Sequence, residues 1–381
     1  MLKRTVTHDT FTVIYWTVAS GNHPMKTSVQ SQQKSKRKGT YRVPTAPQCA
    51  QLREVKEAFV VAGEIIKELP TADNKKGAVD KMLRANGLFR NLPWPKPYDT
   101  TSHRLHLGDA REMSWMSDES VHLVVTSPPY WTLKEYEKAP GQLAEIEDYE
   151  LFLHELDKVW RECARVLVPG GRICCVVGDV CVPRKCGGRH FVMPLHSDIQ
   201  VRTRKLGLDC LTPILWQKIA NGVTEAEGNG AGFYGKPYQP GAIVKNDVEY
   251  ILFLRKGGSY RSPSTLQRVL SMLTKEEMQT WLRSSWSDIR GTSTRNGHPA
   301  PYPVTLAERL IKLYSFVGDV VLDPFAGTGS TALAALAAGR NSVANEIEPR
   351  YFRMALDKLK FAVERSQLFG PINSSLVVDQ D

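Results

Sequence analysis

The chain has 381 residues, of which 42% are hydrophobic, enough to bury the core of one large domain or of a catalytic domain with smaller modules. It carries 50 Lys and Arg against 40 Asp and Glu, and this net charge of +10 favours a polyanionic partner, although charge alone does not identify nucleic acid. Seven cysteines argue against a disulfide framework and favour a reducing, cytoplasmic setting, and no apolar run approaches the roughly 20 residues of a membrane helix.

Residues 1–99 predict a basic, disordered start followed by a helical accessory segment. Residues 28–40 consist mainly of Gln, Ser, Lys and Arg without apolar periodicity, which is typical of a disordered segment. Apolar residues then recur at helical spacing from residue 50 onward, and Pro70 ends that pattern. The proline-rich residues 91–97 predict a linker into the next domain.

From residue 101 onward, short β-rich runs alternate with amphipathic helical patterns. We expect strands at residues 121–126, 172–178, 210–216, 248–254, 319–323 and 341–346, and helices at residues 149–167, 196–206, 330–338 and 349–363. Pro169, Gly170 and Gly171 follow the first of these helices as its stop signal. This alternation predicts an α/β fold, a doubly wound parallel sheet with helices on both faces.

Two stretches interrupt the alternation and are not needed to complete the sheet. Residues 220–246 are rich in glycine and aromatic residues, and residues 257–297 mix Arg, Ser and Trp around a short helical pattern. Such insertions are where α/β enzymes carry substrate-specific loops. We therefore divide the chain into residues 1–99, a catalytic half at 100–256, a candidate recognition region at 257–297, a cofactor-binding half at 298–365 and a tail at 366–381.

A glycine-rich turn follows the strand at residues 319–323. Gly327 and Gly329 allow close backbone approach of a ligand, and Glu346, at the end of the next strand, can accept hydrogen bonds from ribose hydroxyls. A dinucleotide site satisfies the same glycine pattern, with Ala332 as its third member. Asp323 argues for another ligand, because a carboxylate there repels a pyrophosphate but suits the ammonium group of an amino-acid cofactor.

A second turn, Ser127-Pro128-Pro129-Tyr130, follows the expected strand at residues 121–126. The two prolines stiffen the backbone and remove two amide donors, which leaves a fixed set of acceptors. An amino group on an aromatic base is a poor nucleophile, and the Ser127 hydroxyl and the Pro128 carbonyl can accept its hydrogens. Tyr130 offers an aromatic face for an extruded base. The same four residues are also compatible with a turn that packs against the core.

At these two turns the sequence resembles the DNA amino-methyltransferases, the N4-cytosine and N6-adenine enzymes that accompany restriction systems. The serine form of the first motif is more typical of N4-cytosine members, and the catalytic motif precedes the cofactor motif, as in the β group. Weaker matches extend the resemblance over about residues 105–359. They lie at Asp109, at residues 167–171, at Trp216 with Lys218 and at residues 298–314. It assigns catalysis to Ser127, Pro128, Pro129 and Tyr130, and cofactor binding to Asp109, Asp323, Pro324, Phe325, Gly327, Thr328, Gly329, Ser330 and Glu346.

The resemblance implies a methyltransferase sheet with S-adenosyl-L-methionine as cofactor, an inserted target-recognition region and an N-terminal helical extension. It further implies base flipping in double-stranded DNA and direct in-line transfer to N4 of cytosine, without a metal or a covalent intermediate. The implied setting is a restriction-modification system, with a cognate endonuclease acting separately and no membrane partner. Five arginines of the recognition region are candidates for contacts to guanines or phosphates: Arg261, Arg268, Arg283, Arg290 and Arg295.

Three alternatives remain open at this point. An N6-adenine methyltransferase shares both motifs, because serine in the first motif biases the choice of base without fixing it. A nicotinamide-dependent oxidoreductase also uses a glycine turn, but Asp323 and the Ser-Pro-Pro-Tyr turn disfavour it. A non-catalytic DNA-binding protein with a methyltransferase fold is disfavoured because both motifs are intact.

Overall fold

The computed structural model describes residues 77–90, 93–131, 140–182, 188–218, 247–292, 302–369 and 372–380, together with single helical positions between residues 57 and 68. The expected disordered start at residues 28–40 and the insertion at 220–246 lie outside the described residues. Within the described part, no helix has the length and apolar character needed to cross a membrane.

One sheet of nine strands organises the described residues, in the order β11-β1-β10-β9-β2-β3-β7-β6-β8. Among these described strands, only β7 runs antiparallel to its neighbours, β3 and β6. The strands are β1 (Thr100–Leu107), β2 (Val121–Thr126), β3 (Leu167–Val177), β6 (Leu208–Gln217), β7 (Val248–Lys256), β8 (Ser285–Trp286), β9 (Val320–Asp323), β10 (Asn341–Glu346) and β11 (Asn373–Gln380). The α/β fold with a mostly parallel sheet is thereby confirmed.

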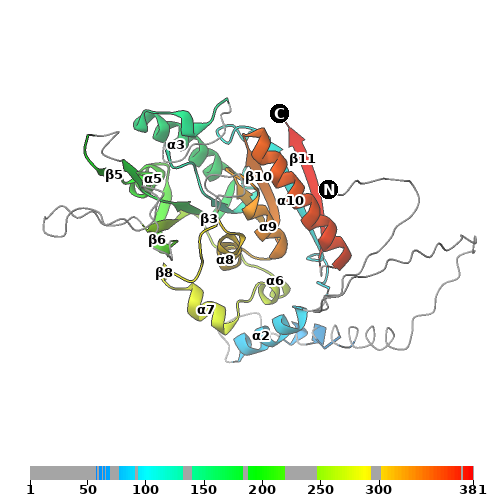
Figure 1. Ribbon diagram of the computed structural model, residues 1–381. Helices are drawn as coiled ribbons and strands as arrows, with labels where there is room; N and C mark the ends of the chain where they lie inside the picture. The colour runs from blue at the N-terminus through cyan, green and yellow to red at the C-terminus, as the bar shows by residue number, and fades with distance from the viewer. Residues whose placement is uncertain are drawn as a thin grey trace, which may run out of the picture. The chain divides into compact units, whose positions relative to one another are not determined.

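Helices pack on both faces of this sheet (Figure 1). On one face lie α3 (Tyr149–Val166) and α5 (Leu195–Lys205), and on the other lie α8 (Val304–Tyr314), α9 (Ser330–Ala337) and α10 (Pro349–Phe369). Asp148 caps α3 by accepting a hydrogen bond from the Leu151 amide at 2.7 Å, and the helix buries Phe152 and Trp160. A small second sheet joins β4 (Val180–Val182) to β5 (Phe191–Met193).

The parallel strands bring both sequence motifs to one edge of the sheet. β9 pairs with β2 on one side and with β10 on the other, so Ser127 follows β2 next to the glycine turn that follows β9. The carboxyl edge of an open α/β sheet is where such folds bind ligands. The catalytic and cofactor motifs, about 200 residues apart in the chain, therefore share one edge.

The start of the candidate recognition region lies at the opposite, amino edge. Because β7 is antiparallel, the chain reaches that edge after Lys256 and continues into α6 (Thr265–Leu270) and α7 (Lys275–Trp281). The Gln267 side chain donates to the Val317 carbonyl, just before β9, at 2.9 Å. Residues 257–282 are thus placed away from the motif edge, contrary to what a recognition role for the whole of 257–297 requires.

Three further expectations about elements were wrong. Ser285–Trp286 does join the sheet, as β8 beside β6, although this region was not expected to contribute a strand. β3 begins at Leu167, directly after α3, and not at residue 172 as expected, although its pairing with β2 shifts register between Leu167 and Arg172. Residues 366–381 are not simply a tail, because α10 extends to Phe369 and β11 pairs with β1 along its length.

The accessory segment contains a helix, α2 (Ala78–Phe89), which packs against α6. Its Asn86 side chain donates to the Val269 carbonyl at 2.9 Å, and its Phe89 belongs to the same apolar cluster as Val269 and Val317. Residues 93–98 also pack against the sheet domain, since Trp94 and Tyr98 join this cluster. The expected linker is therefore anchored at the amino edge.

Candidate active site at the carboxyl edge

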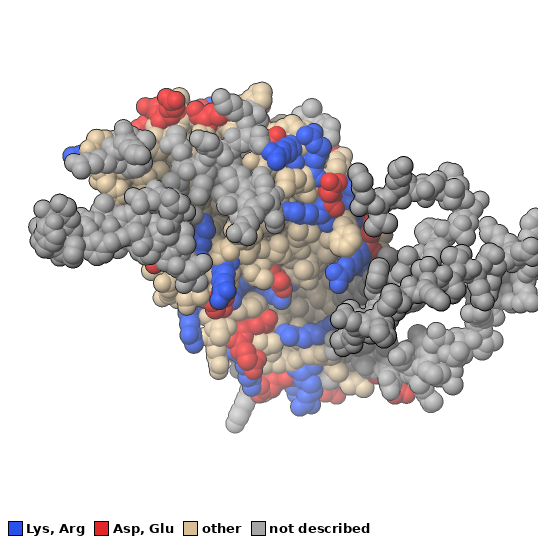
Figure 2. Space-filling model, viewed as in Figure 1, with Lys and Arg blue, Asp and Glu red and all other residues tan. Residues whose placement is uncertain are grey.

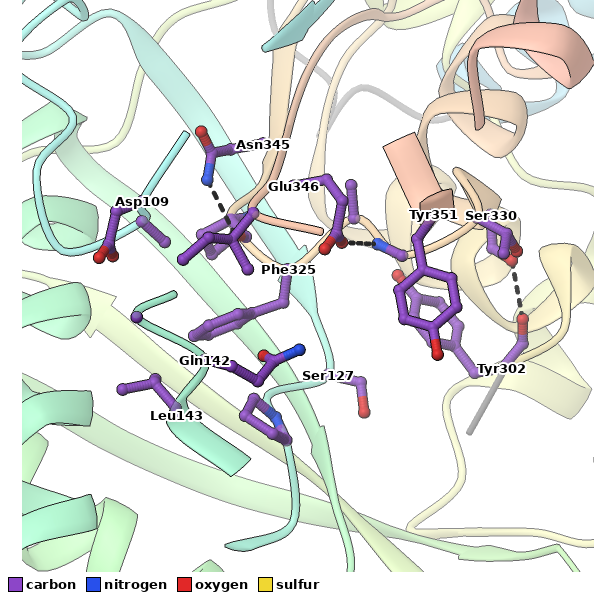
Figure 3. Close-up of a pocket in the computed structure, with 18 residues that line it drawn as sticks. Asp109, Ser127, Gln142, Leu143, Tyr302, Phe325, Ser330, Asn345, Glu346 and Tyr351 are labelled. Carbon is purple, nitrogen blue, oxygen red and sulfur yellow. Dashed lines mark hydrogen bonds between the residues drawn. The ribbon is translucent and has the colours of Figure 1, made fainter. Parts of the chain in front are cut away.

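A cavity with about 810 Å³ of empty space opens at the carboxyl edge, between the two motif turns (Figure 3). Its walls combine residues of both motifs with residues from three other segments. They are Asp109, Ala110, Ser127, Pro129, Gly141, Gln142, Leu143, Tyr302, Pro324, Phe325, Ala326, Gly327, Thr328, Ser330, Asn345, Glu346, Ile347 and Tyr351.

The glycine turn adopts the backbone conformation that the sequence requires of it. Gly327 and Gly329 have φ values of 52° and 83°, in the left-handed region that side chains disfavour. A Cβ on Gly329 would lie 3.2 Å from the Cβ of Ala355 in α10, so the turn also needs the absence of a side chain. The turn brings backbone close to the cavity and starts α9 at Ser330.

Glu346 ends β10 with its carboxylate at the wall of the cavity. The carboxylate accepts hydrogen bonds from the Gly327 amide at 2.6 Å and from the Glu348 amide at 2.9 Å. Burial raises the pKa of Glu346 to about 7, and the two amide hydrogen bonds oppose that rise. Each carboxylate oxygen can accept a further hydrogen bond, which suits a pair of ribose hydroxyls.

The structure gives Asp323 a different role from the expected one. Its carboxylate is 1% exposed, is not among the described residues that line the cavity, and accepts hydrogen bonds from Thr126 at 2.7 Å and Tyr302 at 3.0 Å. The Thr331 hydroxyl and the Phe325 amide are also donors to it. With this set of donors, Asp323 holds β9 to β2, α9 and the segment before α8, and does not face a ligand's ammonium group. Burial raises its pKa.

Asp109, after β1, does reach the cavity, but its carboxylate is held by a neighbour. The Arg111 guanidinium contacts Asp109 at 2.5 Å and Glu155 of α3 at 2.6 Å. The Asn345 side chain donates to the Gly108 carbonyl at 2.9 Å and so ties the end of β10 to the end of β1. These contacts fix the position of Asp109 at the wall of the cavity.

The Ser-Pro-Pro-Tyr turn places the Ser127 hydroxyl at the cavity. This hydroxyl donates to the Tyr130 hydroxyl at 3.2 Å, and Tyr130 donates in turn to the Val176 carbonyl at 3.4 Å. The hydrogen of Ser127 is thereby used within the protein, so its oxygen remains an acceptor toward the cavity. Pro129 also lines the cavity, while Pro128 is buried beside it.

The ring of Tyr130 is not open for stacking in this structure. It is 4% exposed and lies in the core cluster beside α3, against the end of β3. Trp131, which follows it, is partly buried, and its indole nitrogen donates to the Ile146 carbonyl at 2.9 Å. The packing of Tyr130 positions the Ser127 hydroxyl, and stacking of a base on this ring would require it to move.

Four polar or aromatic residues of the cavity were missed in the sequence. Gln142 comes from the segment between β2 and α3, Tyr302 precedes α8, and Asn345 and Tyr351 flank Glu346. The Tyr302 carbonyl accepts a hydrogen bond from Ser330 at 3.0 Å. Asn345 could have been included because it adjoins Glu346, whereas no local signal marks Gln142 or Tyr351.

The arginines of the candidate recognition region have varied surroundings. Arg261 forms an ion pair with the buried Asp319 at the amino edge, so it is not free for a base. Arg283 donates to the Gln279 carbonyl at 3.0 Å within its own helix end. Arg290 is exposed beyond β8, and Arg295 lies outside the described residues.

Comparison with known proteins agrees with this geometry. The family model of DNA methylases of the N6/N4 type matches residues 121–357. The type II methyltransferase M.MjaI of Methanocaldococcus jannaschii is 38% identical over 278 residues, which cover 65% of this chain and 88% of that protein. The crystal structure of TTHA0409 from Thermus thermophilus, complexed with S-adenosyl-L-methionine, is 49% identical, with a TM-score of 0.59 over 73% of this chain and 98% of that one.

A more distant structure shows the same fold. The cytosine-N4-specific PvuII DNA methyltransferase is 18% identical, with a TM-score of 0.50 over 74% of this chain and 97% of that chain. The family match covers more than half of the chain and includes both motif turns, which excludes the nicotinamide-dependent alternative. The chain therefore belongs to the N6-adenine and N4-cytosine DNA methyltransferases, whose methyl donor is S-adenosyl-L-methionine.

Proposed function

We propose that this protein methylates N4 of cytosine in double-stranded DNA. The observation that carries the proposal is the Ser127 hydroxyl, which lies at the cavity with its own hydrogen directed to Tyr130. In this arrangement its oxygen accepts a hydrogen bond from the exocyclic amino group of a flipped base and helps the nitrogen to become pyramidal. The proposed setting is a restriction-modification system in the cytoplasm, with a cognate endonuclease acting separately.

The cavity fits the cofactor on the evidence of its own residues. Glu346 offers carboxylate oxygens to ribose hydroxyls, and Gly327 and Gly329 leave room for close approach of a nucleoside. Asp109, held by Arg111, presents an acceptor at the far wall. S-adenosyl-L-methionine supplies an activated methyl group, and Ser127 directs the amino nitrogen toward it for in-line transfer.

N6-adenine methylation is the competing assignment within the same family. The cavity residues do not distinguish the two amino groups, because Ser127 can accept a hydrogen from either one. Serine at the first position of the motif favours cytosine, and the proposal adopts that choice. A catalytically inactive DNA-binding protein is the remaining alternative.

The test is mass spectrometry of nucleosides from the DNA of cells that express the protein, compared with a Ser127→Ala variant. We expect N4-methylcytosine in the first sample and a decrease of at least about 100-fold in the second, as for loss of one preorganised catalytic contact. Ser120→Ala is a matched control, because the Ser120 hydroxyl donates to the Ser117 carbonyl on the surface, away from the cavity. Calorimetry should show unchanged cofactor affinity in both variants.

The three outcomes separate the alternatives. N4-methylcytosine that disappears only in Ser127→Ala supports both the base and the motif. N6-methyladenine retains the enzyme class and overturns the choice of base. Absence of any modified base from a protein that binds the cofactor supports the inactive DNA-binding alternative.

A further inference from the structure

A second cavity, with about 850 Å³ of empty space, lies at the amino edge of the sheet, away from both motif turns. Its described walls come from β3, from the segments after β7 and α6, and from the end of α8 and the residues that follow it. The described lining residues include no Asp or Glu. They do include three cations and three aromatic rings: Arg172, Arg261, Lys312, Tyr260, Tyr314 and Phe316.

Arg172, in β3, carries a charge that no described group neutralises. Its guanidinium carbon lies 5.7 Å from the ring centre of Tyr260 and 5.5 Å from that of Tyr314. Its Nε is buried without a hydrogen-bond partner, and no ion pair joins its side chain to the part of the chain that the structure describes. Because buried polar groups nearly always have partners, this guanidinium points to an anion from outside the chain.

The other charges at the cavity are neutralised within the protein. Arg261 forms an ion pair with the buried Asp319, and the Lys312 ammonium group lies 2.6 Å from the carboxylate of Glu308. Burial lowers the pKa of His122, so this residue adds no charge at neutral pH. The uncompensated positive charge of the cavity therefore lies on the guanidinium in β3.

Arg309, in α8, provides a contrast because its guanidinium also lies over two aromatic rings. Its carbon is 5.2 Å from the ring centre of Trp281 and 4.7 Å from that of Trp286. Arg309 also lies 2.6 Å from the carboxylate of Asp288, which supplies the anion. Arg172 has similar aromatic surroundings and no such carboxylate among the described residues, so a ligand can take that place.

Backbone instead of side chains forms the wall of the cavity at residues 169–171. Gly170 has a φ of 77°, and its amide donates to the Gly257 carbonyl at 3.4 Å. A Cβ on Gly170 would approach the Ser259 carbonyl oxygen to 2.8 Å, so the segment after β7 packs directly on this backbone. This packing holds the exposed ring of Tyr260 beside the guanidinium.

We propose that this amino-edge cavity binds a nucleoside phosphate, with the phosphate on Arg172 and the base against the aromatic side chains. A guanidinium donates paired hydrogen bonds to phosphate oxygens, and such charge-assisted bonds are the strong ones. Aromatic rings stack with a base of any identity. The ligand is separate from the cofactor and from DNA at the motif turns, because the two cavities lie at opposite edges of the sheet. The proposal does not depend on which base is methylated.

The experiment is calorimetric titration of the full-length protein with guanosine 5′-monophosphate. Saturating S-adenosyl-L-methionine is present throughout, so that the cavity at the carboxyl edge is filled. We expect one binding site in the wild-type protein. Arg172→Met should weaken binding about 10-fold to 100-fold, the effect of losing hydrogen bonds from a charged group. Arg172→Lys should give an intermediate loss, because it keeps the charge without the paired geometry.

Two further variants test the aromatic wall and the specificity of the effect. Tyr260→Leu should weaken nucleotide binding about tenfold, as for loss of one stacked base, and leave competition by inorganic phosphate unchanged. The ring of Tyr260 is 65% exposed, so its replacement should preserve the fold. Arg365→Met is the matched control and should change nothing, because Arg365 is exposed near the end of α10 and does not line the described cavity.

Absence of saturable nucleotide binding would overturn the proposal, and so would equal binding by the wild-type protein and Arg172→Met. A short DNA duplex that displaces the nucleotide would also overturn it, because the phosphate at Arg172 would then belong to a DNA backbone. Urea unfolding and cofactor calorimetry on each variant separate a folding defect from a lost contact. If Arg172→Met does not fold, unchanged nucleotide binding by both Arg172→Lys and Tyr260→Leu refutes the proposal.

Discussion

At Glu346, burial and ligand binding have opposite effects on the ionisation of the carboxyl group. Burial raises its pKa to about 7. Two ribose hydroxyls that donate hydrogen bonds to both carboxylate oxygens favour the ionised form. Near neutral pH the free protein therefore holds a substantial fraction of Glu346 in the neutral form. In the proposed site, cofactor binding would select the charged form and release a proton.

We predict that cofactor affinity depends on pH around this value. The affinity should fall by up to about tenfold for each pH unit below 7, and it should level off about one unit above 7, because the raised pKa makes the free protein hold the proton that binding must expel. Calorimetry at a series of pH values measures this. Glu346→Gln should bind more weakly and with no such dependence, and a pH profile shared by both proteins would assign the effect to another group.

At the same scale, the sequence identified the residues at the strand ends but not the role of each one. Ser127, Gly327 and Glu346 all lie at one edge, around one cavity, because parallel strands place their carboxyl ends together. Asp323 was assigned to the ligand and proved to be buried under donors from distant segments, such as Tyr302. Whether a carboxylate faces a ligand or a hydroxyl depends on tertiary packing that no local pattern records.

Among the elements, β11 extends the sheet beyond what the sequence predicted. It pairs in parallel with all of β1, and its Ser374 hydroxyl contacts Thr101, which also contacts the buried His103. The apolar run in this segment is only three residues long, 376–378, so local periodicity gave little sign of a strand. The strands β2 and β10 were predicted with their observed bounds.

We predict that ending the chain after Phe369 destabilises the domain. The truncation removes the hydrogen-bond ladder to β1, so the free energy of unfolding should fall by at least about 3 kcal/mol, since each lost buried hydrogen bond contributes about 1 kcal/mol. Urea denaturation monitored by circular dichroism measures the change. Val377→Thr is the control, because Val377 is 46% exposed and the ladder does not depend on its side chain. Equal unfolding midpoints for the truncated and full-length chains would contradict a stabilising role for β11.

For the whole molecule, net charge is distributed unevenly along the chain. Residues 1–50 contain eight Lys and Arg against one Asp, so they carry +7 of the total of +10. The remaining residues form one compact unit with +3, and on the face in Figure 2 its basic and acidic side chains are interspersed. Most of the net positive charge of the chain therefore lies in the first 50 residues.

We predict that deletion of residues 1–50 weakens DNA binding in a salt-dependent way. The slope of log affinity against log salt concentration should become less steep by several units, since each phosphate contact contributes about 0.9 to that slope. Filter binding or fluorescence anisotropy at a series of salt concentrations measures it, with cofactor affinity as the unchanged reference. Identical slopes for both proteins would place the phosphate contacts in residues 51–381.

The direction of the chain through the sheet was the part of the architecture that the sequence could not provide. The strand at residues 248–254 was expected, but its antiparallel orientation depends on pairing with β3 and β6. That orientation sends residues 257–282 to the amino edge and leaves residues after β8 to reach the motif edge. A region assigned as one recognition unit is thus divided between two edges.

The hydrogen bond between the amide of Asn373 and the carbonyl of Asp99, at 2.9 Å, shows that the segments before β1 and after α10 meet at the amino edge. A peptide that returns from the end of β11, at the carboxyl edge, to the segment before β1 would close the domain into a ring, and the ring could be cut at the connection before α8. The resulting gene would encode the glycine turn first and the Ser-Pro-Pro-Tyr turn last, with the same neighbours in the sheet. The order of the motifs in such a protein is thus determined by the position of its termini. The chemistry depends only on which strand ends lie side by side.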